Sequence, residues 1–155
     1  MDNDKVISIL NDLVETCRDG QTGFQEAAEN AQSPELKEFF NKVSLERSQC
    51  VGELQQQVHA LGGDPENTGS TAGALHRAWI DIKGTLTGRD DQSILNEAER
   101  GEDSAVEAFR DALEHDDLPA NIRSVIETQF REVQMVHDRV KQMRDARGAG
   151  ASNRP

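Results

Sequence analysis

The stretch Asn96–Asp103, NEAERGED, lies in the middle of a long segment whose apolar residues follow the period of an α-helix. On such a helix Glu99 and Glu102 are three residues apart and therefore share one face. Glu102 also falls on the apolar stripe of its segment, where a helix of a globular protein normally carries an aliphatic side chain. The stretch therefore predicts a helical bundle whose apolar interior is interrupted by polar side chains.

Composition limits both the fold and the class of function. The chain has 155 residues, no Tyr, one Trp, four Pro and a net charge of −12, which suits a single all-α domain. The negative charge repels phosphate backbones and anionic lipid, so we expect no nucleic-acid or membrane partner. No apolar run approaches the ~20 residues that span a bilayer, and the N-terminus MDNDKVISIL lacks the pattern of a signal peptide. We therefore expect a cytoplasmic protein with reduced cysteines.

Four long segments carry an apolar stripe spaced by threes and fours, which is typical of helices in a bundle. They cover residues 4–31, 34–61, 91–115 and 120–144. Short turns at Gln32–Pro34 and Leu118–Pro119 join them in pairs and predict two antiparallel hairpins. The shorter stripe of residues 71–86 predicts a helical crossover between the second and third long helices. We expect one domain over residues 1–146, followed by a disordered tail over residues 147–155.

Near the midpoint of each long stripe, one position that would normally carry an aliphatic residue carries a glycine or a polar residue instead. These positions are Gly20, Arg47, Glu102 and Gln129. In an antiparallel hairpin, residues at the same level have a constant sum of residue numbers. This sum sets Gly20 opposite Arg47, so the missing side chain faces the long charged one, and it sets Cys17 opposite Cys50. The pattern predicts a buried polar layer, whose members are Asp19, Gly20, Arg47, Glu102 and Gln129.

Two interpretations of this layer remain open. In the first, Arg47 pairs with Glu102, and the layer is a metal-free feature of a structural protein, a homo-oligomer or a protein that binds another protein. In the second, carboxylates and one histidine bind Fe or Mn, which suit oxygen and imidazole donors. The candidate ligands are Glu99, Glu102, His137 and Glu46. The fixed positive charge of Arg47 opposes a metal ion, so we favour the first interpretation.

Several short phrases, taken together, resemble an uncharacterised bacterial family of ferritin-like four-helix-bundle proteins. They are Asp19-Gly20-x-x-Gly23-Phe24, Ser44-x-x-Arg47, Gly62-Gly63-x-Pro65, Gly69-Ser70, His76-Arg77-x-Trp79 and Glu99–Asp103, with His137 in the last helix. The resemblance implies a ferritin-like fold and no established activity, while the wider superfamily suggests iron, oxygen or stress chemistry by analogy of fold. Ferritin-like dinuclear sites use Glu-x-x-His, but this chain has Gln134-x-x-His137 instead. Neither a reaction nor a substrate follows from the sequence.

Overall fold

The computed structural model describes residues 1–64 and 90–152, with side chains up to residue 147. These residues form four α-helices and no strand, which confirms the predicted all-α four-helix bundle. The helices are α1 (Asn3–Asn30), α2 (Pro34–Ala60), α4 (Asp91–Leu113) and α5 (Ala120–Ser152). None of the described helices is both long and apolar enough to cross a bilayer. The crossover helix predicted for residues 71–86 lies outside the described residues.

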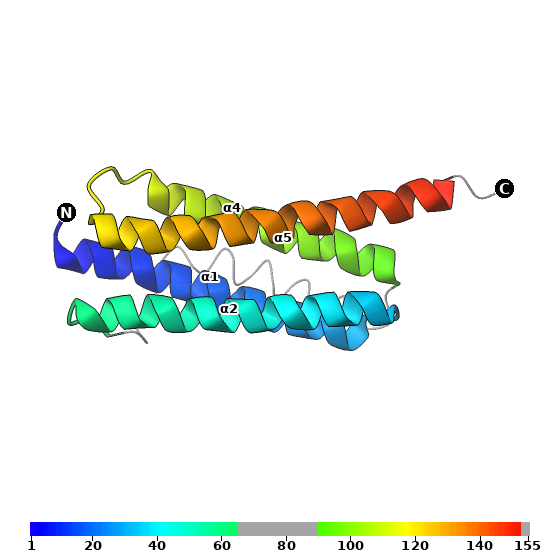
Figure 1. The fold of residues 1–155 in the computed structure, drawn as a ribbon, viewed down its shortest axis with the longest axis horizontal. Coiled ribbons are helices and arrows are strands. Elements are labelled where there is room, and N and C mark those ends of the chain that lie inside the picture. Colours follow the sequence, from blue (N-terminus) through cyan, green and yellow to red (C-terminus); the bar gives the residue numbers. More distant parts are fainter. Residues whose placement is uncertain (65–89, 153–155) are drawn as a thin grey trace.

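The helices pack as two antiparallel hairpins, α1 with α2 and α4 with α5 (Figure 1). α1 also packs against α4, whereas contact between α2 and α5 is sparse. The order around the bundle is therefore α1, α2, α5, α4, with α2 and α4 on a diagonal. α2 and α4 run in the same direction, so the end of α2 and the start of α4 lie at opposite ends of the bundle.

Three of the helices begin at residues that suit a helix start. Asp2, Ser33 and Asp90 are the N-caps of α1, α2 and α4, and each side chain accepts a hydrogen bond from a backbone N–H in the first turn. Pro34 opens α2 at a position where its missing N–H costs nothing. After α2, Gly62 adopts φ 80°, a left-handed conformation that glycine takes without strain.

The last helix is longer than the sequence predicts. α5 continues to Ser152, whereas the sequence predicts a disordered tail from residue 147 because no apolar stripe continues there. A helix that has already formed gains one hydrogen bond for each residue added, so it extends without a stripe. Arg147 also reaches back to Asp91 of α4 at 3.8 Å. The helix therefore runs into the predicted tail, while the division into a domain over residues 1–146 and a tail stays a prediction.

The core consists of two apolar clusters that follow each other along the bundle axis. On α2 they occupy residues 36–43 and 50–58, and on α4 they occupy residues 94–98 and 105–112. Phe24, Phe40 and Phe109 are the largest fully buried side chains. The polar residues Arg47 and Glu102 lie in the interval between the two clusters, so they divide the core at mid-height.

Asp91 connects the second hairpin to the first. Its carboxylate accepts hydrogen bonds from the backbone N–H groups of Gln32 at 2.7 Å and Ser33 at 3.0 Å. Asp91 is the first residue of α4 and is buried. The start of α4 is therefore fixed against the turn between α1 and α2.

We expect Asp91→Ala to lower the free energy of unfolding by about 1–3 kcal/mol, because two backbone N–H groups lose their acceptor. Asp91→Asn should cost less, since its amide oxygen still accepts one hydrogen bond. Urea denaturation followed by circular dichroism measures both variants. Equal stability of Asp91→Ala and the unmodified chain would contradict the role of this contact.

Candidate functional site

An ion pair joins Arg47 of α2 to Glu102 of α4 in the interior of the bundle. Nη1 of Arg47 donates to Oε1 of Glu102 at 2.7 Å, and Nη2 donates to Oε2 at 2.5 Å. The two residues are 3% and 0% exposed. The geometry is bidentate, so both oxygens of the carboxylate are engaged by one guanidinium. The pair links two helices that lie on a diagonal of the bundle.

α1 makes room for the guanidinium of Arg47. A Cβ atom at Gly20 would lie 2.8 Å from Nη1 of Arg47, closer than packed atoms allow. One turn later, the ring centroid of Phe24 lies 5.5 Å from Cζ of Arg47, within the range of a cation–π contact. The predicted placement of Gly20 opposite Arg47 is confirmed.

Arg47 keeps its charge in the interior. Burial alone would lower the pKa of its guanidinium, but the charge and hydrogen bonds of Glu102 outweigh this effect and raise the pKa of Arg47 above its ordinary value. A permanent positive charge therefore occupies the centre of the bundle.

The two cysteines lie beside this pair and contact each other. Cys17 and Cys50 are free, buried thiols. A hydrogen bond with Cys17, together with burial, raises the pKa of Cys50 well above its ordinary value. Sγ of Cys50 also lies 3.7 Å from a carboxylate oxygen of Glu132. The two thiols thus pack as small apolar side chains in the interior.

Gln129 and Asp19, the other predicted members of the polar layer, are also buried. Nε2 of Gln129 lies 3.4 Å from the carbonyl oxygen of Cys50 and 3.5 Å from a carboxylate oxygen of Glu53. These contacts connect α5 to α2. Asp19 lies beside Gly20 on α1.

A second polar cluster lies between α4 and α5 and contains Glu99, Asp103 and His137. One potential ligand atom from each residue lies within 4.8 Å of the other two. Nε2 of His137 is 2.5 Å from Asp103, and its Nδ1 is 3.2 Å from Asp138. Two carboxylates and one imidazole suit Fe or Mn. Glu99 already pairs with Arg144, which a metal ion would have to displace.

The structure brings together only two of the four predicted metal ligands. Glu99 and His137 meet, but Glu102 is bound to Arg47, and Glu46 lines a groove between α2 and α5. The sequence analysis did not include Asp103 among the candidate metal ligands. The signal was available, because Asp103 follows Glu99 at the i,i+4 spacing that places both on one helix face.

We expect Gly20→Ala to lower the free energy of unfolding by about 1–3 kcal/mol, because its methyl group displaces Nη1 from a hydrogen bond to a buried carboxylate. Gly52→Ala is the matched control, since a Cβ atom at Gly52 would meet nothing within 4 Å. That control should raise stability by up to about 1 kcal/mol through helix propensity. Urea denaturation compares the two. A Gly20→Ala variant as stable as Gly52→Ala would exclude the close approach of Arg47.

His137 should titrate above its ordinary pKa of 6.5. Burial lowers the pKa of His137, but hydrogen bonds to Asp138 and Asp103 raise it by more. Because folding raises this pKa, the associated stability is fully present below about pH 6.5 and is lost as the pH rises through the folded value.

NMR titration of His137 measures this pKa directly. Asp103→Asn should lower it, whereas Asp111→Asn, which changes an exposed carboxylate elsewhere on α4, should leave it unchanged. An identical titration curve for Asp103→Asn and the unmodified chain would disprove the His137–Asp103 contact.

Residues 5–115 match the family described as "Domain of unknown function (DUF2383)". The match covers more than half of the chain, so the chain belongs to this family, and the expectation of an uncharacterised family is confirmed. No curated protein matches the chain. The matched region includes both Arg47 and Glu102, whereas His137 lies beyond it.

Proposed function

We propose that this member of the DUF2383 family is a cytoplasmic structural or partner-binding protein with a metal-free interior. The observation that carries the proposal is the bidentate ion pair between Arg47 and Glu102. The guanidinium of Arg47 is itself a cation at the centre of the bundle, and it neutralises the carboxylate of Glu102. The free, facing thiols of Cys17 and Cys50 suit a reducing compartment, which supports the cytoplasmic location.

A metal ion at mid-height would meet two obstacles. It would need Glu102 as a ligand, but both oxygens of this carboxylate already accept hydrogen bonds from Arg47. It would also lie near the fixed charge of Arg47. Two like unit charges 4 Å apart repel by about 4 kcal/mol at the effective dielectric constant of a protein, and a divalent ion is repelled more strongly.

The ion pair gives the interior a structural role instead. Burying two charges costs about as much free energy as their attraction returns, so the pair adds little net stability. Its contribution is to alignment, because sliding one hairpin along the other would leave a buried charge without its partner. The polar layer therefore supports a bundle with one fixed register.

A second candidate function is metal binding between α4 and α5. The cluster of Glu99, Asp103 and His137 favours it, because its three potential ligand atoms lie close together. Fe or Mn bound there would give the chain an iron-related or stress-related role of the kind seen by analogy in ferritin-like proteins. This site lies at the side of the bundle and would leave the Arg47–Glu102 pair intact.

Chain purified without chelator should contain far less than one Fe or Mn ion per molecule. Glu102→Ala should lower the free energy of unfolding by about 3–5 kcal/mol, because it leaves Arg47 buried without its partner. The double variant Arg47→Met/Glu102→Leu should recover most of this loss, since apolar side chains replace both charges. Urea denaturation and elemental analysis measure these quantities.

The metal content of two variants separates the candidate functions. Near-stoichiometric Fe or Mn that disappears in the Arg47→Met/Glu102→Leu variant would reject the metal-free interior. Metal retained in that variant but lost in His137→Ala would instead establish the site between α4 and α5.

A further inference from the structure

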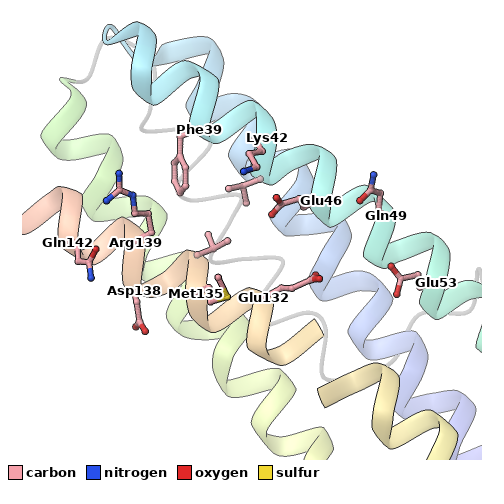
Figure 2. Close-up of a pocket in the computed structure, with 12 residues that line it drawn as sticks. Phe39, Lys42, Glu46, Gln49, Glu53, Glu132, Met135, Asp138, Arg139 and Gln142 are labelled. Carbon is pink, nitrogen blue, oxygen red and sulfur yellow. The ribbon is translucent and has the colours of Figure 1, made fainter. Parts of the chain in front are cut away.

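Among neighbouring pairs of the described helices, α2 and α5 pack least closely against each other. The seam between them contains a groove with a volume of about 720 Å³, whose lining residues are drawn in Figure 2. Its apolar lining comes from Phe39 and Val43 of α2 and from Met135 and Val136 of α5. Met135 is 71% exposed. A flexible, polarisable methionine side chain at the open side of a groove adapts its shape to apolar groups of a partner.

Charged side chains line the same groove in two groups. Glu46, Glu53 and Glu132 lie toward one end, and Lys42 and Arg139 lie toward the other, together with Asp138. Within the described part of the chain, neither Lys42, Arg139 nor Glu46 forms an ion pair. Figure 2 shows Glu46 and Glu132 in the space between the two helices. The carboxylates outnumber the cations, so the groove favours a basic partner.

The length of the groove matches a short helix. Its lining residues on α2 run from Phe39 to Glu53, which spans about 21 Å at the rise of an α-helix. A helix of about 14 residues has the same length. A small-molecule pocket encloses most of its ligand, whereas this groove lies along an open seam between two helices. Its shape therefore favours an extended, rod-like occupant.

We propose that the α2–α5 groove binds an amphipathic helix of a partner protein, with aliphatic side chains on one face and lysine or arginine on the other. The aliphatic face would pack on Phe39, Val43 and Met135, and the basic face would pair with the carboxylates at the acidic end. This is the helix-in-groove mode of recognition. The net charge of −12 adds long-range attraction for such a partner. The inference rests on the partner-binding role proposed above and names the class of partner.

A fluorescein-labelled 14-residue Leu–Lys peptide tests the proposal, with leucines at positions i, i+3, i+4 and i+7 so that they form one face. The full chain is titrated against it at low ionic strength, and fluorescence anisotropy gives the Kd. Saturable binding is expected. A peptide of the same composition, with the leucines scattered around the helix, should bind at least about tenfold more weakly because it lacks an apolar face.

Two pairs of variants locate the binding surface. Glu46→Lys should raise the Kd at least about tenfold, whereas Glu107→Lys, which makes the same charge change on the exposed surface of α4, should change it less than about twofold. Met135→Asp should also weaken binding about tenfold, although it adds a negative charge. Leu45→Asp is its control, because Leu45 is 61% exposed and does not line the groove. Thermal melting by circular dichroism verifies that each variant is folded.

Three outcomes would overturn the proposal: no saturable binding, equal affinity for the scattered peptide, or equal weakening by Glu46→Lys and Glu107→Lys. The last two would mean that net charge alone attracts the peptide. The titration does not depend on metal content. A chain without metal that fails to bind the peptide would reject the groove, while a metal-loaded chain that binds it would reject only the metal-free interior.

Discussion

A buried charge must have a partner, and this requirement organises the whole bundle. Arg47 and Glu102 neutralise each other across the diagonal between α2 and α4. The guanidinium needs space, which α1 provides by having no side chain at Gly20. The ring of Phe24 then lies against the guanidinium. One interaction thus sets the levels of three helices relative to one another, and α5 takes its position mainly from its hairpin with α4.

The charge pair also explains why the core has two parts. Apolar side chains pack above and below the pair in separate clusters, and neither cluster alone specifies a unique alignment, because aliphatic residues repeat every turn or so along each helix. A shift of one helix by a turn would still bury apolar groups, but it would separate the pair. The apolar clusters therefore supply most of the stability, and the pair supplies uniqueness.

Sequence reasoning succeeded where short turns limit the geometry. The turn between α1 and α2 is brief, so counting residues on either side of it correctly placed Gly20 opposite Arg47. The connection between α4 and α5 is longer and leaves their relative level less certain. Counting residues across it still sets Glu99 near His137, and the structure brings these two residues together, while the ring of His137 also contacts Asp103, one turn from Glu99. The contact of Arg144 with Glu99 depends on where a long flexible side chain turns, which periodicity does not specify. The distance between α2 and α5 could not be predicted either, because the apolar stripe of a helix does not determine how closely two helices pack.

Because the Arg47–Glu102 pair is buried, salt affects it differently from the charges on the surface of the protein. Dissolved ions screen charges at the surface within about 10 Å at ordinary ionic strength, but they hardly reach a pair that is excluded from water. The alignment of the helices is therefore insulated from changes in salt. The acidic surface is exposed to dissolved ions, so its attraction for basic molecules weakens as the salt concentration rises. The interaction between the buried charges is therefore nearly independent of salt concentration, whereas the attraction between the acidic surface and basic molecules depends on it.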